Sequence, residues 1–450
     1  MKQSHMWLLL VLVGSLCLPK SSFGTEPQAF VDATHTGYHK ILLGCPDLIW
    51  PGSNWSNLNF LLFSHREKKA WLIGADFDQP KVLLASEFAL PAQGLSYSFG
   101  EIESKTTVFL ATDIYQGMDI SASRTFRLGV HELFHRVFQK NWVKPSKSRW
   151  PEYPLEWKPR YLRRMLFDSL KAALLSNQSM YPAIFWYQRW RIEFPEELSR
   201  ATDGYEGSAR YIDLQAATLS RLTCAATKDE VKADYLKYFA YLSFDTDMDL
   251  DLEGYYLGSL GLFMLDLRDG TKNWTKQLPL GKTPLELLLN GYAHPGIADN
   301  DELAREYREK IEARNLEVEK VIGPEIDLFK SKDALRIAIP ASWKQPDFYN
   351  TEQSYLVREL KNLEFSPLAA SHSFSSQTGS ITLSKGKALF IGESPALSPC
   401  PDHSLDFFLL AKAAVKSEGA IYSCDPSSGV SCNFIGSPRL RDGVTWICPR

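Results

Sequence analysis

The spacing of apolar and polar positions divides the chain into stretches of different period. From residue 25 to about 120, short apolar or alternating runs are separated by Pro, Gly, Ser and Asp, which predicts strands in HKILLG, NFLLFS, KAWLIG, KVLLA and TTVFLATDIY. From Phe126 onward, apolar residues recur at helical spacing, as at Val130 and Phe134, which predicts an amphipathic helix. The chain therefore changes from strand to helix near residue 120.

Helical spacing continues to about residue 321. Helices are expected in YLRRMLFDSLKAALLS, MYPAIFWYQRWRIEF, EGSARYIDLQAATLSRL, EVKADYLKYFAYL, YYLGSLGLFMLDL, TPLELLLNGY and DELAREYREKIEARNLEVEKV. From about Pro324 the chain returns to strand-like segments, as in ALRIAIPASW, SITLS, KALFIG and VTWICP. The pattern predicts an α+β fold with a short β-rich region at 25–98, a mainly helical domain at 99–323 and a β-rich module at 324–450.

The N-terminus has the pattern of a signal peptide, which we place at residues 1–24. Lys2 and His5 precede the apolar run MWLLLVLVGSLCL, which is too short to span a bilayer comfortably. Small residues at Ser22 and Gly24 provide a cleavage site before Thr25. No later transmembrane segment is expected, so the sequence predicts export to a periplasmic or extracellular location.

Charge and cysteine content narrow the class of protein. The net charge is only -3, which gives no indication of a nucleic-acid partner. Six cysteines follow the predicted signal peptide, and an even number in an oxidising compartment predicts disulfides, especially in the C-terminal module. No C-x-x-C pair occurs, which argues against a metal site among them, and the pairing is not fixed by sequence. The six are Cys45, Cys224, Cys400, Cys424, Cys432 and Cys448.

The candidate chemistry begins in FRLGVHELFHRVFQKNW at residues 126–142. Residues four apart lie on one face of a helix, so His131 and His135 can bind one metal ion. Glu132 is rotated by about 100° from His131 and can act on metal-activated water without being a ligand. The alternative is an amphipathic helix in which the two histidines are incidental.

A catalytic zinc site needs a third protein ligand and an open position. The best candidate is Glu206, near the start of the helix predicted in DGYEGSARYID. The alternative is a capping box, with Asp203 as the N-cap residue and Glu206 three positions later. The two roles compete, because a carboxylate bonded to a backbone amide is a poorer metal ligand.

The segment EGSARYID resembles the E-G-x-[AT]-x-Y-x-[ED] motif of gluzincin metallopeptidases of the aminopeptidase N-like and glycyl aminopeptidase-like families. The resemblance covers about residues 99–290 and implies a zincin-like catalytic domain. It also implies one Zn²⁺ per chain, bound by His131, His135 and Glu206. Asp213 would then orient a ligand histidine, the alternative being a solvated charge on the helix face.

Two weaker motifs follow the order of the same families. YYLGS resembles a Y-x-x-G segment whose tyrosine stabilises the oxyanion, which implies this role for Tyr255, with Tyr256 or plain core packing as alternatives. GEIES resembles a G-x-M-E-N element that anchors a free amine, which implies this role for Glu103. Ile102 and Ser104 depart from that element, and a plain surface strand is the alternative.

The sequence thus predicts an exported zinc peptidase acting on a peptide or protein substrate, with aminopeptidase activity if Glu103 binds an amine. The 71 positions from His135 to Glu206 exceed the usual connection in these families, which implies an inserted pair of helices. A zinc amidase or other hydrolase with a non-peptide substrate is one alternative. The other is an inactive secreted metal-containing binding protein, against which the glutamate of HELFH argues. The oligomeric state is not predicted.

Overall fold

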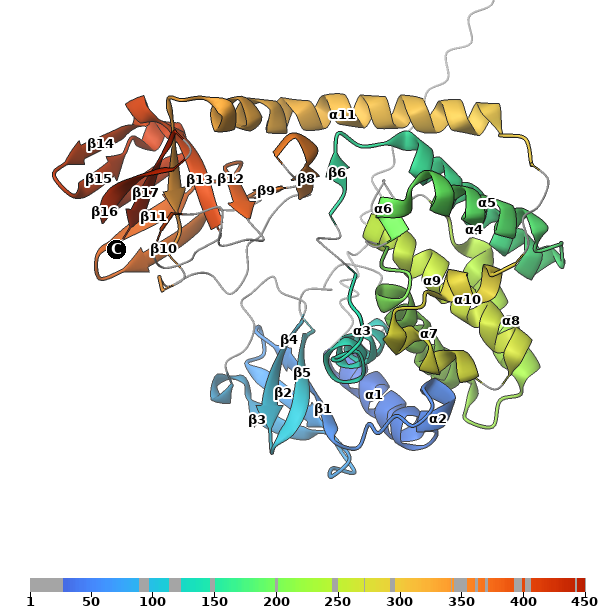
Figure 1. Cartoon of the computed structure of the whole chain (residues 1–450). Helices are drawn as coiled ribbons and strands as arrows, with labels where there is room; N and C mark the ends of the chain where they lie inside the picture. The colour runs from blue at the N-terminus through green and yellow to red at the C-terminus, as the bar shows by residue number, and fades with distance from the viewer. Residues whose placement is uncertain are drawn as a thin grey trace, which may run out of the picture.

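The computed structural model shows an α+β protein, as predicted (Figure 1). An N-terminal sheet, a central group of helices and a C-terminal β-rich region follow one another along the chain. The predicted signal peptide lies outside the described residues. These are 27–88, 97–112, 123–145, 150–198, 201–244, 250–270, 272–291, 296–340, 342–343, 354–360, 363–368, 371–391, 399–400, 406–441 and 443–449.

The N-terminal sheet contains five strands in the order β3-β2-β1-β5-β4. They are β1 (Leu58–Ser64), β2 (Lys69–Ile73), β3 (Lys81–Leu84), β4 (Tyr97–Ile102) and β5 (Lys105–Ala111). The strands predicted in NFLLFS, KAWLIG, KVLLA and the first part of TTVFLATDIY are therefore confirmed. β1 pairs in parallel with β5, and β4 forms one edge of the sheet.

The strand predicted in HKILLG is wrong, because the described chain begins with helices. α1 (Pro27–Gly37) continues into the π-helix η1 (Tyr38–Leu43), and α2 (Pro46–Ile49) follows. A short apolar run does not distinguish a buried helix from a strand. Here the side chains of Phe30, Tyr38 and Ile41 recur at helical spacing and are buried in the main core.

The central region is helical, as predicted. The helix of the HELFH segment, α3 (Ser123–Leu133), continues into the π-helix η4 (Phe134–Phe138). The two helices expected between His135 and Glu206 are present as α4 and α5. The remaining bounds are α4 (Trp157–Ser176), α5 (Tyr181–Glu193), α6 (Pro195–Leu198), α7 (Tyr205–Leu222), α8 (Lys228–Tyr241), α9 (Leu250–Asp269), η5 (Asn273–Lys276), η6 (Leu278–Leu280) and α10 (Pro284–Leu289).

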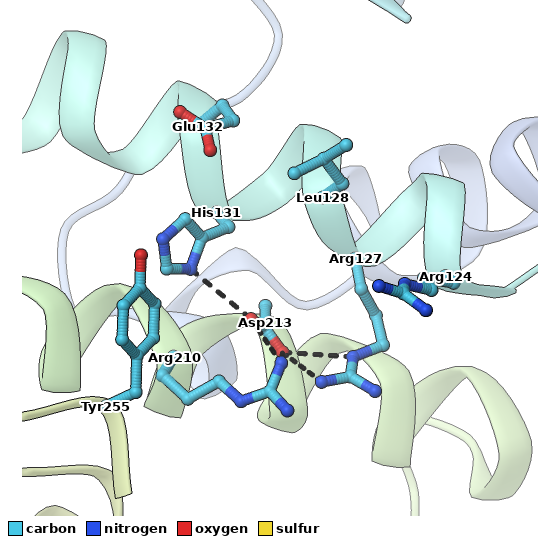
Figure 2. A pocket seen from close by; sticks show the side chains of 8 residues that line it. All are labelled: Arg124, Arg127, Leu128, His131, Glu132, Arg210, Asp213 and Tyr255. Carbon is cyan, nitrogen blue, oxygen red and sulfur yellow. Dashed lines mark hydrogen bonds and ion pairs between the residues drawn. The ribbon is translucent and has the colours of Figure 1, made fainter. Parts of the chain in front are cut away.

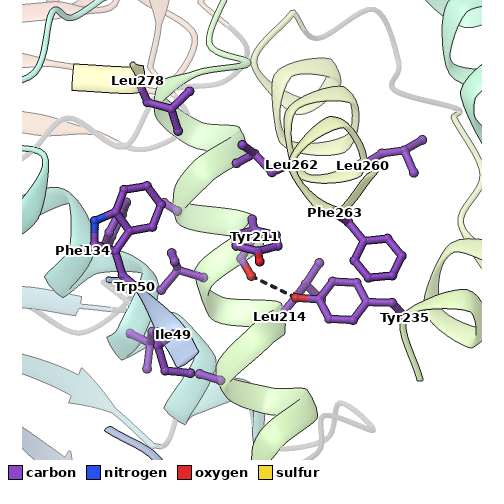
Figure 3. Packing of buried hydrophobic residues seen from close by; sticks show 14 of the residues in the cluster. Ile49, Trp50, Phe134, Tyr211, Leu214, Tyr235, Leu260, Leu262, Phe263 and Leu278 are labelled. Atoms are coloured by element: carbon purple, nitrogen blue, oxygen red, sulfur yellow. Dashed lines mark hydrogen bonds between the residues drawn. The ribbon is translucent and has the colours of Figure 1, made fainter. Parts of the chain in front are cut away.

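α7 lies at the centre of this region and most of its residues are buried. Its apolar face packs with α8 and α9, where Tyr235 stacks on Phe263 with ring centroids 4.2 Å apart (Figure 3). Gly207 of α7 and Gly258 of α9 bring the two backbones together. A Cβ atom on Gly207 would lie 2.5 Å from the Gly258 Cα, closer than real Cβ contacts allow.

The long helix α11 (Asp301–Lys330) runs from the helical region to the C-terminal module (Figure 1). It passes through Pro324, so the predicted change to strands at that residue is displaced to β7, which begins at Ala334. A single proline removes one helical hydrogen bond. Burial of Ile322 and Ile326 on either side of the proline favours continuation of the helix.

The C-terminal strands belong to a twelve-stranded sheet with the path β10-β11-β16-β17-β7-β13-β12-β9-β8-β6, to which β14 and β15 are added beside β16. The last strand of this path, β6 (Glu152–Tyr153), comes from the connection between η4 and α4 and pairs in parallel with β8. The others are β7 (Ala334–Ala338), β8 (Tyr355–Val357), β9 (Leu363–Pro367), β10 (His372–Ser376), β11 (Gly379–Leu383), β12 (Ala388–Ile391), β13 (Asp406–Ala411), β14 (Val415–Glu418), β15 (Ile421–Cys424), β16 (Val430–Arg441) and β17 (Val444–Pro449).

All six cysteines after the predicted signal peptide form disulfides, which confirms the expectation of paired cysteines. Two bonds lie in the C-terminal module, and the third joins the start of α2 to the end of α7. The pairs are Cys45–Cys224, Cys400–Cys448 and Cys424–Cys432. Disulfides of this kind are typical of proteins in oxidising compartments. Within the described ranges, no helix combines the length and apolarity needed to cross a membrane.

Candidate metal centre

The three predicted metal ligands converge where α3 and η4 face the start of α7. His131 lies in the last turn of α3, His135 lies in η4, and Glu206 lies in the first turn of α7. The Nε2 atom of His135 lies 3.0 Å from both the His131 Nε2 and the Glu206 Oε2 atoms. The remaining side of this triangle, from His131 Nε2 to Glu206 Oε2, is 3.4 Å.

These distances fit one zinc ion. Bonds of about 2.0–2.1 Å in tetrahedral geometry place two ligand atoms roughly 3.3 Å apart. Two imidazole nitrogens and one carboxylate oxygen are also the donor set of a catalytic zinc site, which leaves a fourth position for water or substrate. Among the residues described, this is the group of His, Cys, Asp and Glu side chains whose ligand atoms lie close enough to hold a metal ion.

Asp213 lies two helical turns after Glu206 on α7 and faces the back of His131. Its Oδ2 atom is 3.3 Å from His131 Nδ1, as expected for a carboxylate that orients a ligand histidine (Figure 2). Burial alone would raise the pKa of Asp213, but the guanidinium groups of Arg127 and Arg210 prevail and hold it well below its usual range. Only 3% of Asp213 is exposed, so the alternative of a solvated helix charge does not hold.

Gln139 supports His135 in the same manner and was not predicted from the sequence. Its Oε1 atom contacts His135 Nδ1, while its Nε2 group donates hydrogen bonds to the Tyr205 carbonyl at 2.8 Å and the Ser208 hydroxyl at 2.7 Å. The ring of Tyr205 stacks on His135 with centroids 4.6 Å apart. Gln139 follows His135 by four residues, and this spacing is the signal that could have indicated it.

The two supporting contacts determine which ring nitrogens carry hydrogen. Ionised Asp213 can only accept, and Gln139 presents its carbonyl oxygen, so each histidine donates from Nδ1. When the rings carry no further proton, both Nε2 atoms direct lone pairs at the Glu206 carboxylate. A cation between these atoms would stabilise the arrangement, because all three groups are electron donors. A proton can take that place, because the contacts with Asp213 and Glu206 outweigh burial and raise the pKa of His131 to about 9.

Glu132 occupies the position expected of a general base. Its side chain lines the same cavity as His131, and it is not one of the three converging ligands. Burial raises the pKa of Glu132 above its usual value, and a hydrogen bond from Tyr97 on the edge strand β4 opposes this shift. A glutamate with a raised pKa beside a metal site is suited to accepting and returning a proton.

Of the two adjacent tyrosines, Tyr255 is the one that the structure places at the site. Its ring stacks on His131 with centroids 5.5 Å apart, and its hydroxyl points toward the region between His131 and Glu132 (Figure 2). Tyr256 instead packs beside Phe167 and Phe244 in the core. A phenol in the position of Tyr255 can donate a hydrogen bond to negative charge developing beside the metal.

Glu103 is the predicted residue that the structure does not bring to this cavity. It lies in the turn between β4 and β5 with a φ of 52°. Its carboxylate pairs with Lys81 at 3.1 Å, and its side chain is 44% exposed. Glu103 therefore has the exposed surface position that the alternative of a plain surface strand implies, although it lies in the turn directly after β4.

The capping-box alternative for Glu206 is also settled by geometry. The N-cap residue of α7 is Gly204, and no side chain caps the helix. Asp203 instead forms a buried ion pair with Arg163, at 2.5 and 3.2 Å. Glu206 is therefore available to the histidines, and its contacts with them outweigh burial and hold its pKa well below the usual range.

An open cavity of about 450 Å³ adjoins His131, Glu132 and Tyr255, large enough for several atoms of a substrate. Comparisons of the chain with family models, with curated proteins and with solved structures find no match. The interpretation of this centre therefore depends on the side chains and their geometry.

Proposed function

We propose that this protein is a zinc-dependent hydrolase of gluzincin type that cleaves peptide bonds after export from the cytoplasm. The observation that supports this proposal best is the convergence of His131, His135 and Glu206, with Asp213 and Gln139 fixing the two rings from behind. Purely structural zinc sites have four protein ligands, whereas this group offers three beside an open cavity.

The chemistry divides among a few side chains. When bound to the three ligands, zinc supplies Lewis-acid polarisation of a carbonyl group and a lower pKa for water in its fourth position. Glu132 takes a proton from the attacking water and returns it to the leaving amine, a task for which its raised pKa is suited. The Tyr255 hydroxyl donates a hydrogen bond to the oxyanion that forms at the carbonyl.

The alternatives differ in what the same site would do. An inactive binding protein would not need a glutamate beside the metal, so the position of Glu132 in the cavity favours an enzyme. A zinc amidase would use the same residues on another carbonyl compound, and the resemblance to gluzincin peptidases favours a peptide. Because Glu103 is paired with Lys81, the aminopeptidase specificity is not included in the proposal.

Metal analysis combined with one substitution tests the proposal. The purified protein should contain one zinc ion per chain and hydrolyse members of a mixed peptide library. Glu132→Gln should keep the zinc and lower hydrolysis by about 10²–10⁴-fold, as expected for loss of a general base. Mass spectrometry of the products gives both the rate and the bond that is cut.

A matched control is Glu103→Gln, which removes an exposed carboxylate outside the cavity and should leave hydrolysis unchanged. Equal activity of wild type and Glu132→Gln would contradict the proposed mechanism. A wild-type protein that lacks stoichiometric zinc after purification in zinc-containing buffer would contradict the metal centre itself.

A further inference from the structure

The cavity beside the metal centre carries three arginines that the hydrolytic mechanism does not use directly. Arg124 and Arg127 lie about two turns and one turn before His131, respectively, on the same face of α3, and Arg210 faces them from α7 (Figure 2). Leu128 provides an apolar wall between the arginines and Glu132. The arginines therefore lie within the space that a substrate at the metal centre would enter.

Among the described residues that line the cavity, cationic side chains outnumber anionic ones. Three guanidinium groups face two lining carboxylates, those of Asp213 and Glu132. Asp213 forms ion pairs with Arg127 at 2.8 Å and with Arg210 at 3.2 Å, and its Oδ2 atom also contacts His131 Nδ1. Glu132 lies on the far side of His131 from the arginines (Figure 2). Arg127 and Arg210 therefore share one carboxylate, which balances only part of their combined positive charge.

Arg127 and Arg210, which are partly buried, also have hydrogen-bond donors left over. Arg127 uses Nε and Nη2 for Asp213, and its Nη1 group has no partner among the described residues. Arg210 uses Nη1 for Asp213 and Nη2 for the Tyr238 hydroxyl. Since a guanidinium group carries five N–H donors, several remain available to a ligand.

The position of Arg124 adds to the positive potential. It is the second residue of α3, a helix of 11 residues, and its side chain is exposed at the cavity. The first turn of a helix carries a partial positive charge from its unpaired backbone N–H groups. A carboxylate bound between Arg124 and Arg127 would thus meet two guanidinium groups and a favourable helix terminus.

We propose that these arginines form a specificity pocket for a carboxylate of the substrate, so that the enzyme prefers peptides with an anionic group close to the cleaved bond. The inference rests on the proposed function for the reaction, but the binding pocket can be tested separately. The carboxylate has two sources, an acidic side chain or the free C-terminus of the peptide. Both would form charge-assisted bonds with planar guanidinium groups.

Pairs of peptides that differ in one group test the proposal. A Glu residue is compared with Gln at each position around the cleaved bond, and a free C-terminal carboxylate is compared with its amide. We expect kcat/KM to be about tenfold or more higher for the anionic member of one pair, the scale of a charge-assisted hydrogen bond. The pair that shows the preference identifies the source of the carboxylate.

Arg124→Ala should remove most of this preference while the neutral peptides are cleaved at nearly the wild-type rate. The matched control is Arg305→Ala on α11. The side chain of Arg305 is 69% exposed. This control should keep the preference. Arg124→Glu should reduce cleavage of the anionic peptide further and leave the neutral one little changed. Because Arg124 is exposed, these substitutions should preserve the fold, which the thermal unfolding temperature verifies.

Binding measured without turnover separates this inference from the proposed reaction. In the Glu132→Gln protein, calorimetric titration with the anionic and neutral peptides should show about tenfold tighter binding of the anionic one, and Arg124→Ala should abolish the difference. Equal binding and equal cleavage of both peptides would overturn the specificity pocket and leave the hydrolase intact. Preferential binding without hydrolysis by the wild type would overturn the proposed reaction and retain the pocket.

Discussion

At the scale of single residues, the candidate metal centre depends on the side chains behind the candidate ligands as much as on those ligands themselves. Asp213 and Gln139 each accept from an Nδ1 atom, so both histidines present Nε2 to the same point. Gln139 has a further role, because its amide group is bonded to the Tyr205 carbonyl next to Glu206. It therefore links His135 to the first turn of α7, which carries Glu206.

Gln139→Leu should weaken zinc binding without removing a ligand. The substitution leaves His135 Nδ1 without its acceptor and frees the first turn of α7, and loss of such partners typically lowers metal affinity by about 10–100-fold. Competition with a chromogenic chelator measures the affinity. Gln188→Leu, on α5, removes a comparable hydrogen bond to the Gly291 carbonyl and should not change zinc binding. An unaltered affinity in Gln139→Leu would show that the contact is incidental.

The sequence identified the three converging side chains because helical spacing and the HELFH and EGSARYID motifs are local. The same spacing applied further along the helix would have indicated Gln139, four residues after His135, and Arg127, four residues before His131. Glu103 shows the opposite case. Its motif was degenerate. In addition, its contact with Lys81 joins the turn between β4 and β5 to strand β3, and no local pattern predicts such a contact.

At the scale of elements, the contact between α7 and α9 positions two parts of the site at once. Gly207 follows Glu206, and Gly258 lies one turn after Tyr255, so the glycines of both motifs meet at one helix crossing. A Cβ on Gly258 would lie 2.1 Å from the Asp203 carbonyl oxygen. The glycines thus let the two helices approach closely enough to place the ligand and the tyrosine around one cavity.

Gly258→Ala should destabilise the protein and disturb the centre together. The added methyl group has no space, and overpacking of this kind costs about 1–3 kcal/mol or more. We expect a lower unfolding temperature together with weaker zinc binding, because α7 must move away from α9. Chemical denaturation and chelator competition measure the two effects.

The matched control is Gly261→Ala, one turn further along the same helix. There the added Cβ would lie 3.3 Å from the Pro284 Cβ atom, which small adjustments can accommodate. The gain in helix propensity, about 1 kcal/mol, offsets the tighter contact. Equal stability of the two variants would contradict the role given to the crossing.

Most helices and strands were predictable because their period extends over many residues. The exceptions have identifiable causes. HKILLG contains too few apolar positions to reveal its period, and Pro324 was interpreted as a boundary although burial of α11 on both sides favours the helix. The pairing of β6 with β8 was beyond sequence analysis, since it joins two short segments far apart in the chain.

At the scale of the whole molecule, the C-terminal module is joined to the helical region by more than one chain crossing. The segment around β6 contributes Tyr153, which is bonded to Glu319 of α11, and Leu155, whose N–H donates to Asn315 at 2.8 Å. The Leu356 N–H donates to the Pro151 carbonyl at 2.9 Å. The boundary predicted at 323/324 therefore falls inside a helix that packs on both parts.

A protein truncated after Lys330 should fold poorly. Removal of the module exposes the buried residues Val318, Ile322 and Ile326 of α11 and leaves β6 without a partner strand. We expect a low yield of soluble protein. We also expect that circular dichroism will show no cooperative unfolding transition. Supplying residues 331–450 as a separate chain should recover part of the yield. A truncated protein with the unfolding temperature and zinc affinity of the full chain would show that the helical region folds without the module.

The place of β6 in the C-terminal sheet also sets an order in time. Glu152 and Tyr153 are synthesised long before Leu356 and Val357, with which they pair. At about 5–20 residues per second, this strand waits on the order of ten seconds or longer for its partner. The connection that follows α3 and η4 can therefore reach its final position only after most of the chain has left the ribosome.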